Sequence, residues 1–361
     1  MVLSRVDALT LGAGENQIQC GVIDDIIGFA YFATNTSPIR VVKIRLSDFT
    51  QVGTLNLTGS QSRPRGAVID KSNGFAYFCS YSDGKVSKVR LSDFTEVAVL
   101  NTSATTGIYG AVIDTVNGFI YCSKRVMFIT PRLIKIRLSD FTEVGTLTPS
   151  SAFVSQAPVI DISNGFSYWG SSSNDPSIVR KVRSSDFTEI SNLNLIAGDS
   201  YAYSGVIDEN NGFSYYGMYT APGRIVKIRH SDFTRVGHVT LNAGEEECMS
   251  ADISLQAGFA YFGTNDNITP GNLVKIRLSD FTRVEGIALS AGENYPYSMV
   301  LDISNGFGYI GTLTSPGIIV KFSDPDMIPV SAVTNLLGRS PFRSTGASVS
   351  GGIECGRGKE R

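Results

Sequence analysis

The sequence predicts an all-β chain that folds as a seven-bladed β-propeller with four strands in each blade. A Gly-Phe pair recurs seven times, with the glycines 44 to 48 residues apart at positions 28, 74, 118, 165, 212, 258 and 306. This period is typical of four-stranded propeller blades. Each unit holds short β-rich segments, and the one segment that the last unit lacks has a counterpart at the N-terminus.

The second unit illustrates the four strands expected in a blade. They read "GAVID" at 66–70, "FAYFCSY" at 75–81, "KVSKVRLS" at 85–92 and "TEVAVLN" at 95–101. Val, Ile, Phe, Tyr and Thr favour strands, whereas the intervening "KSNG" and "SDF" are typical of turns. A lone sheet of this kind has two apolar faces, and radial packing of the blades covers both.

The seventh unit is incomplete at its C-terminal end. It ends in "VKFSDPDM", where Pro325 stands in place of the phenylalanine of "SDF" and no fourth strand follows. "RVDALTLGAGEN" at 5–16 matches "RVGHVTLNAGEE" at 235–246 but precedes the first full unit. We therefore expect residues 5–11 to complete the last blade and close the ring, which removes two open sheet edges. The expected propeller spans 1–323, and 324–361 is expected to be a poorly ordered polar tail rich in Gly, Ser and Arg.

Composition limits the possible partners and locations. Lys and Arg total 31 against 33 Asp and Glu, so no nucleic-acid partner is expected. No run of 18 apolar residues occurs, so no membrane insertion is expected. The first residues lack the features of a secretory signal. The chain is expected to be cytoplasmic if it is complete, or secreted or on the cell surface if a leader precedes it.

The five cysteines are at 20, 79, 122, 248 and 355. Their odd number and wide spacing indicate neither a disulfide framework nor a zinc site. We expect free thiols, including Cys79 and Cys122 on the second strands of adjacent blades, and no metal or other cofactor.

The repeats resemble those of a known family. "FAYFATN" at 29–35 and "FAYFGTN" at 259–265, each followed by an "IVKIR"-like strand, are similar to the repeats of YVTN-type propellers of surface-layer-like proteins. The resemblance covers about 320 residues. It implies a seven-bladed propeller and a cell-surface setting, and it carries over no catalytic residue.

Residues that recur in every unit are expected to be structural. The Asp that closes "VID" recurs at 24, 70, 114, 161, 208, 252 and 302, and either a calcium ring or hydrogen bonds to the following turn would explain it. We favour the turn. The Lys and Arg of the third strand, such as Lys43 and Arg45, are expected to form salt bridges across blade interfaces, although a basic binding stripe is conceivable. His230 and His238 lie in no catalytic motif.

The candidate binding face is the variable one. The turns between strands one and two and between strands three and four are nearly constant, whereas the other connections vary. Four places before each "VID" Asp stand small residues, namely Cys20, Gly66, Gly110, Ala157, Ser204, Cys248 and Ser298. One place earlier stand Gln19, Arg65, Tyr109, Gln156, Tyr203, Glu247 and Tyr297. We expect these larger residues to surround the mouth of the central channel, as a ligand site or as a solvated rim.

Further candidates flank this set. Tyr201 and Tyr295 stand two residues before Tyr203 and Tyr297, so each pair is expected to share one side of its strand. Acidic residues, Glu245 and Glu247 among them, introduce blades one, five, six and seven. Basic residues are found in blades two and three, namely Arg63, Arg65, Lys124, Arg125 and Arg132. The face could therefore be bipolar, which suits a protein or polar polymer partner.

Three functions are compatible with these patterns. The first is a monomeric, non-enzymatic interaction module that binds a protein or glycan at the channel mouth. The second is a propeller enzyme of the lactonase or lyase kind, for which Glu245, Glu247 and Tyr297 are the plausible catalytic residues. The third is a structural subunit of a surface layer or filament.

Overall fold

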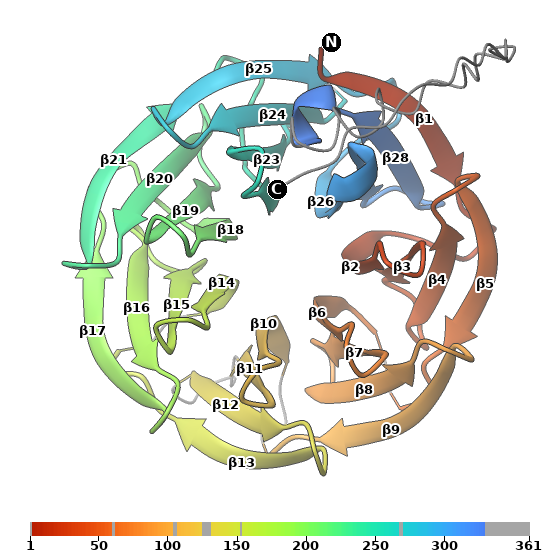
Figure 1. Cartoon of the computed structure of the whole chain (residues 1–361), viewed down its shortest axis with the longest axis horizontal. Helices are drawn as coiled ribbons and strands as arrows, with labels where there is room; N and C mark the ends of the chain where they lie inside the picture. Colours follow the sequence, from red (N-terminus) through yellow and green to blue (C-terminus); the bar gives the residue numbers. More distant parts are fainter. Residues whose placement is uncertain are drawn as a thin grey trace, which may run out of the picture. The chain divides into compact units, whose positions relative to one another are not determined.

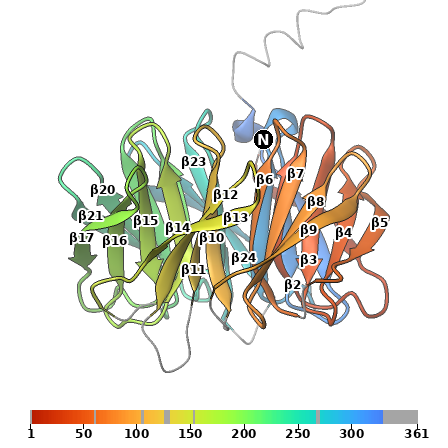
Figure 2. The same ribbon diagram turned by 90° about the horizontal axis from the view of Figure 1, so that it is seen from below.

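A computed structural model describes residues 2–59, 62–103, 107–124, 131–151, 154–266 and 270–328. Seven four-stranded antiparallel sheets stand around a central axis (Figure 1). Seen from the side, the blades form a short cylinder with two flat faces, and the N-terminus lies at one of them (Figure 2). The predicted seven-bladed propeller is confirmed.

The first four blades follow one another along the chain. Blade one contains β2 (Ile18–Asp24), β3 (Phe29–Thr34), β4 (Arg40–Arg45) and β5 (Thr50–Asn56). Blade two contains β6 (Pro64–Asp70), β7 (Phe75–Ser80), β8 (Lys85–Arg90) and β9 (Thr95–Asn101). Blade three contains β10 (Ile108–Asp114), β11 (Phe119–Lys124), β12 (Arg132–Arg137) and β13 (Thr142–Leu147). Blade four contains β14 (Ser155–Asp161), β15 (Phe166–Ser171), β16 (Ile178–Arg183) and β17 (Thr188–Asn194).

The last three blades complete the ring. Blade five contains β18 (Ala202–Asp208), β19 (Phe213–Met218), β20 (Arg224–Arg229) and β21 (Thr234–Thr240). Blade six contains β22 (Ser250–Ser254), β23 (Phe259–Thr264), β24 (Asn272–Arg277) and β25 (Thr282–Ala288). Blade seven contains β26 (Pro296–Asp302), β27 (Phe307–Thr312), β28 (Ile318–Ser323) and β1 (Ser4–Thr10). Two 3-10 turns, η1 (Ile303–Asn305) and η2 (Pro325–Met327), lie in or after blade seven.

The N-terminal strand closes the ring as expected. β1 pairs antiparallel with β28, from Ser4 opposite Ser323 to Thr10 opposite Ile318, and it is the outermost strand of blade seven (Figure 1). Leu3 and Leu11, at the two ends of β1, are almost fully buried. The first and last parts of the chain therefore share one sheet.

The recurrent Asp of the first strand stabilises the following turn. In blade two, Asp70 accepts hydrogen bonds from the backbone nitrogen of Asn73 at 3.1 Å and from its side chain at 2.8 Å. Gly74 then adopts the left-handed φ of 70° that glycine tolerates best. The same contact recurs between Asp114 and Asn117, and the structure supports the turn interpretation of these carboxylates.

The predicted salt bridges of the third strand across blade interfaces are found where Lys275 of blade six pairs with Asp324, and not in blades one and two. Arg45 pairs with Asp48 of its own "SDF" turn, 2.8 Å away, because the short turn returns that carboxylate to the strand end. Lys43 instead places its Nζ 4.1 Å above the ring of Phe29, a cation–π contact within the blade. The same pattern holds in blade two for Arg90 with Asp93.

The phenylalanine of each "SDF" turn packs against the preceding blade. Phe94 lies beside Tyr31 of blade one, with ring centroids 5.7 Å apart. Five further pairs have centroid distances of 5.5 to 5.9 Å, namely Phe49–Tyr309, Phe141–Tyr77, Phe187–Tyr121, Phe233–Tyr168 and Phe281–Tyr215. These tyrosines are buried, so the turn residue anchors one blade to the next.

The interface between blades six and seven uses a different anchor. Met327 is fully buried beside Tyr261, whereas Pro325 only begins the short turn η2. Asp324 accepts from the Tyr261 hydroxyl at 2.7 Å and pairs with the buried Lys275 at 2.6 Å. The ring that meets Tyr261 is that of Phe322 on β28, with centroids 5.9 Å apart, and Met327 packs in the same buried cluster. Residues 324–328 therefore belong to the propeller. Residues 329–361 lie outside the described residues.

The cysteines of the described residues are free and buried, as expected. Cys79 and Cys122 belong to one apolar cluster between blades two and three, together with Ile108 and Ile134. A hydrogen bond with Cys79 and burial raise the pKa of Cys122 well above its usual value, so the thiol stays protonated. Cys355 lies outside the described residues.

Candidate functional site

The mouth of the central channel is formed where each first strand begins. In six blades the register between the first and second strands shifts there by one residue, which marks a β-bulge. In blade two, for example, Pro64 lies opposite Ser80 and Gly66 lies opposite Cys79, so Arg65 has no partner in the ladder. A bulge redirects its extra side chain, and here that side chain points into the channel mouth.

Small residues beside each bulge let the first strands approach one another closely. A Cβ on Gly66 would lie 3.2 Å from the Ala111 side chain of blade three. A Cβ on Gly110 would lie 2.8 Å from Pro158 of blade four. Packing between neighbouring first strands therefore explains the predicted ring of small residues.

Blade six differs from the sequence-based assignment. Ser250 lies opposite Gly263 in the position that Gly66 has opposite Cys79, so Ser250 and not Cys248 belongs to the small ring. The residue before it, Met249, lines the channel in place of Glu247. Asp252 is not the equivalent of the "VID" aspartates. Ser254 holds their position in the first strand, because it lies four residues before the left-handed Gly258, as Asp70 lies four residues before Gly74.

Two cavities meet at this level of the channel. The inner one has a volume of about 260 Å³ and extends past Gln19 to Gly21, Ala67 and Met299. The outer one has a volume of about 470 Å³ and opens between Val154, Ser172, Ser173 and Tyr219. Six residues line both cavities and are here called the mouth floor: Arg65, Tyr109, Gln156, Tyr203, Met249 and Tyr297.

Contacts across the axis join three blades within the mouth floor. Arg65 of blade two donates from Nη1 to Gln156 Oε1 of blade four at 3.3 Å. The Tyr297 hydroxyl of blade seven donates to the same oxygen at 3.2 Å. The Arg65 guanidinium also lies over the Tyr297 ring, 5.2 Å from its centroid. These residues lie where the outer and inner cavities meet.

Arg65 differs electrostatically from most arginines of the propeller. Burial lowers the pKa of its guanidinium, and the nearby groups that act on it are tyrosines and Arg63. Within the described ranges no carboxylate forms an ion pair with Arg65, and its Nε lacks a hydrogen bond. The carboxamide oxygen of Gln19, a buried side chain, is likewise unsatisfied among those residues. Buried polar groups are normally paired, so these atoms have the capacity to bind polar groups of a ligand.

The tyrosines surround the outer cavity in contacting pairs. The rings of Tyr203 and Tyr219 have centroids 4.7 Å apart, and those of Tyr81 and Tyr109 are 4.9 Å apart and nearly perpendicular. Tyr81 and Tyr219 lie in the connections after second strands, and the count from the aspartates missed both. Their position directly after the "FAYFCS" and "FSYYGM" strands is the sequence signal that could have found them.

The predicted pairing of Tyr201 with Tyr203 on one strand side is wrong. Tyr201 has a left-handed φ of 56° and precedes β18, and the bulge at Tyr203 interrupts the alternation. Tyr295 departs from Tyr297 in the same way, with a φ of 55°. Five residues share this left-handed position and are here called the mouth rim: Gln17, Arg63, Tyr201, Glu247 and Tyr295.

Glu247 lies in the mouth rim and is buried. It accepts a hydrogen bond from the Asn265 side chain at 3.4 Å. It also lies beside Tyr219, where burial, with a contribution from Glu247, raises the pKa of that hydroxyl to about 12. The rim thus carries a carboxylate on blade six and the exposed guanidinium of Arg63 on blade two.

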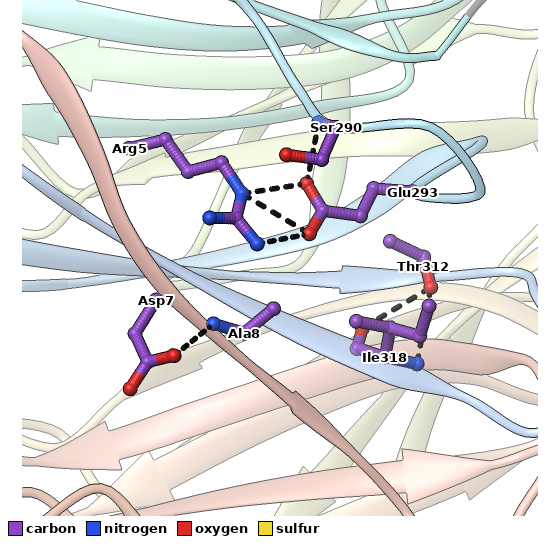
Figure 3. Close-up of polar contacts among 7 residues, drawn as sticks. All are labelled: Arg5, Asp7, Ala8, Ser290, Glu293, Thr312 and Ile318. Carbon is purple, nitrogen blue, oxygen red and sulfur yellow. Dashed lines mark hydrogen bonds and ion pairs between the residues drawn. The ribbon is translucent and has the colours of Figure 1, made fainter.

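Glu245, also predicted as a site residue, has a structural role. It accepts hydrogen bonds from the backbone of Asn242 and from Arg283 on the outer strand β25. Glu293 does the same with Ser290 and with Arg5 of β1 (Figure 3). The acidic residues of blades one and five bind Gln51 and Arg235 in the same way. These carboxylates, here called loop clamps, are engaged inside the fold.

In blades two, three and four the carboxylate and the donor of the loop clamp exchange places. There the outer strand provides the carboxylate and the preceding loop provides the donor. The pairs are Glu96 with Thr58, Glu143 with Ser103 and Glu189 with Ser150, at 2.8 to 2.9 Å from the backbone nitrogen. The loop clamps therefore remove four acidic residues from the proposed bipolar face, namely Glu15, Asp199, Glu245 and Glu293. Lys124 is buried and bonds to Thr102, and Arg125 lies outside the described residues.

The two histidines are structural as well. His230 stacks on Tyr168 of the preceding blade with ring centroids 4.1 Å apart, and burial lowers its pKa to about 4. His238 on β21 contacts Arg235 at 2.7 Å. In the described part of the chain, no three His, Cys, Asp or Glu side chains are grouped as metal ligands. No helix in those same ranges is long and apolar enough to span a membrane.

Comparisons with known proteins support the fold alone. No protein-family model matches the chain, and no curated protein matches its sequence. The β-propeller domain of Cps50 (Swd1) from Myceliophteria thermophila is similar in structure, with a TM-score of 0.65 and 12% identity over 87% of this chain and 99% of that one. Hydrazine synthase of Kuenenia stuttgartiensis has a TM-score of 0.71 and 10% identity over 86% of this chain and 96% of that one. The chain is a seven-bladed β-propeller whose channel mouth holds a half-buried arginine surrounded by tyrosines.

Proposed function

We propose that this propeller is a non-enzymatic interaction module that binds a protein or glycan partner at the channel mouth. The observation that carries the proposal is Arg65, a desolvated cation without an ion-pair partner among the described residues, at the base of an open cavity of about 470 Å³. Taking a charge out of water is costly unless a partner compensates it. A ligand that reaches the mouth floor would supply that partner.

The composition of the mouth agrees with a binding role. Tyr and Arg are the residues most often found at the energetic centre of interfaces. Tyr109, Tyr203, Tyr219 and Tyr297 line the outer cavity, and they combine apolar area with a hydroxyl. The opposite face is more uniform, because the Asp–Asn turns and "SDF" turns recur from blade to blade.

The enzymatic alternative is less favoured by the geometry. Of its three candidate residues, Glu245 is bound to Arg283, and only Tyr297 lines the mouth floor. Glu247 lies in the rim beside Asn265 and Tyr219. An acid and a base would need to meet at one reacting atom.

The setting is part of the proposal. The resemblance of the repeats to YVTN-type propellers supports a role on a cell surface, where the mouth would be presented to other molecules. A structural subunit of a surface layer remains the alternative use of the same fold.

Capture from the native source tests the proposal. The full chain would be immobilised beside a variant with Tyr203→Ala and Tyr297→Ala, and bound proteins and glycans would be quantified by mass spectrometry. Aromatic anchors that behave as hot spots contribute about 2 kcal/mol each, so the variant should lose most of the captured partner.

The matched control places two substitutions on the opposite face. Ile26 and Val116 lie in turns between first and second strands and are 82% and 77% exposed. The variant Ile26→Ala with Val116→Ala should capture the partner as the parent does. If this control loses the partner while the tyrosine variant retains it, the function belongs to the other face.

A further inference from the structure

We infer that the mouth floor receives the C-terminal carboxylate of a peptide segment of the partner, an inference that rests on the proposed function. Arg65 would bind the carboxylate, and the tyrosines of the outer cavity would contact the residues that precede it. Arg65 has a side-chain donor without a hydrogen-bond partner among the described residues, lies at the base of the outer cavity and is surrounded by tyrosines.

The guanidinium of Arg65 has capacity for an anion. Its Nε has no hydrogen-bond partner in the described residues, and its Nη1 makes only the 3.3 Å contact with Gln156. Its planar fork matches a carboxylate in a bidentate geometry, and such charge-assisted bonds are about twice as strong as neutral ones. Stacking on Tyr297 at 5.2 Å holds the fork in place. The side chain is therefore preorganised for a planar anion.

The depth of Arg65 favours the end of a chain over its middle. Arg65 lines both the outer and the inner cavity, so it lies at the level where the two meet. Gln156 joins Arg65 and Tyr297 across the axis at this level. The leading end of a polymer that enters from outside therefore meets these groups at the base of the outer cavity. A peptide carries a carboxylate at its terminus by necessity, whereas the carboxylates of an acidic glycan are repeated along its length.

The cavity walls suit the last residues of a peptide. Tyr203 of the mouth floor contacts Tyr219, and Tyr109 of the mouth floor contacts Tyr81, so two aromatic pairs flank Arg65. Tyrosine provides contact area at low entropic cost and can bond to backbone groups. Glu247 in the rim, beside Tyr219, would attract peptide N–H donors or a basic side chain and would repel an additional acidic one. The mouth should therefore prefer C-termini that lack acidic residues near the end.

The test uses two random octapeptide libraries that differ only at the C-terminus. One library ends in a free carboxylate and the other in a carboxamide. Each would be passed over the immobilised full chain, and the retained peptides would be sequenced and then measured individually by fluorescence anisotropy. The free-acid library should be enriched, and amidation of a selected peptide should weaken its binding at least tenfold, as expected for loss of a charge-assisted pair.

Three variants separate the role of Arg65 from a general charge effect. Arg65→Met should abolish the preference for the free acid, and Arg65→Lys should retain only part of it because the fork is lost. Arg63→Gln removes the same charge from the exposed rim and should change affinity less than threefold. Arg65→Met should melt at or above the parent temperature, because a half-buried cation without an ion-pair partner among the described residues is removed.

The outcomes distinguish this inference from the proposed function. Equal binding of acid and amide peptides at a site that the Tyr203→Ala, Tyr297→Ala variant destroys would overturn the carboxylate inference and leave the interaction module standing. Retention of uronate-terminated oligosaccharides, with no peptide enriched, would also overturn it in favour of a glycan. Failure of peptides, oligosaccharides and native partners alike to bind at the mouth would overturn both.

Discussion

Asp252 shows how one residue of the repeat departs from its equivalents. In six blades the corresponding position of the first strand is valine, at 22, 68, 112, 159, 206 and 300, and blade six has a carboxylate there. Burial raises the pKa of Asp252 from 3.8 to about 6, although the backbone nitrogens of Ile253 and Leu301 donate to it at 2.8 and 3.0 Å. The folded state therefore favours the protonated carboxyl.

This pKa predicts a pH-dependent stability. As the pH rises from about 4 to about 6, the unfolded chain loses the proton first, so the free energy of unfolding decreases and stays lower at neutral pH. Asp252→Asn should remove this loss, which amounts to at most about 3 kcal/mol. The melting temperatures of parent and variant should be similar at pH 4 and should diverge in favour of the variant above pH 6.

Asp280, an exposed turn residue, is a suitable control because its pKa is shifted in the opposite direction to that of Asp252. Hydrogen bonds from Thr282 and Arg277 lower the pKa of Asp280, so its contribution is present at neutral pH and lost on acidification. Asp280→Asn should therefore be slightly less stable than the parent at pH 7 and equal to it in acid. A melting temperature of Asp252→Asn that follows the parent at every pH would refute the account of Asp252.

The prediction that Glu247 lines the channel mouth is wrong because of Asp252. "ADIS" resembles "VID", and counting back from Asp252 instead of Ser254 gives Glu247 in place of Met249, an offset of two residues. Counting instead from Glu245 gives nine residues to Ser254, as from Glu15 to Asp24, and identifies Met249. The sequence contained the correct register, but only a second reference point revealed it.

At the scale of strands and loops, the sequence contains a pattern that predicts the loop clamps, although charge patterning alone did not identify it. The outer strand begins with "TEV" in blades two and three and with "TEI" in blade four, and none of these blades has an acidic residue in the preceding loop. Blades with Gln or Arg in place of that Glu have an acidic loop. This reciprocal change indicates contact, whereas charge alone suggested a binding surface.

The short element after β28 supports a second stability prediction. Truncation after Asp324 removes the buried Met327 and the Asp326 carboxylate, which lies 2.8 Å from Lys275 Nζ. Loss of a buried methionine side chain typically costs about 2 to 5 kcal/mol, so the thermal midpoint should fall by several degrees. Truncation after Ile328 should leave the midpoint unchanged, and equal midpoints for the two truncations would contradict the anchoring role of Met327.

At the scale of the whole molecule, the repeat predicted what is local and periodic. Strand order and the turns follow from patterns within about 50 residues, and the closing strand follows from the match between residues 5–16 and 235–246 of another repeat. The mouth floor joins Arg65, Gln156 and Tyr297, which are 91 and 141 residues apart along the chain. Which of seven channel-facing side chains meet across the axis depends on their lengths and bulge geometry, and no periodic pattern encodes it.

Ring closure gives the last prediction. Deleting residues 1–12 from the chain that ends at Ile328 removes β1, the buried Leu3 and Leu11, and the ion pair of Arg5 with Glu293. The exposed edge of β28 should lower the thermal midpoint by more than about 10 °C or cause aggregation. A circular permutant that begins at residue 13 and carries residues 2–12 after Ile328 provides the matched control. β28 and β1 then form a hairpin like the last two strands of the other blades, because Ser4 lies opposite Ser323. The permutant should melt near the parent temperature, since the ring needs the strand and not its covalent link to β2. Equal melting temperatures of the deletion variant and the parent would mean that β1 contributes nothing to closure. Equal destabilisation of the deletion variant and the permutant would mean that the covalent connection at Gly12, and not the strand β1, stabilises the ring.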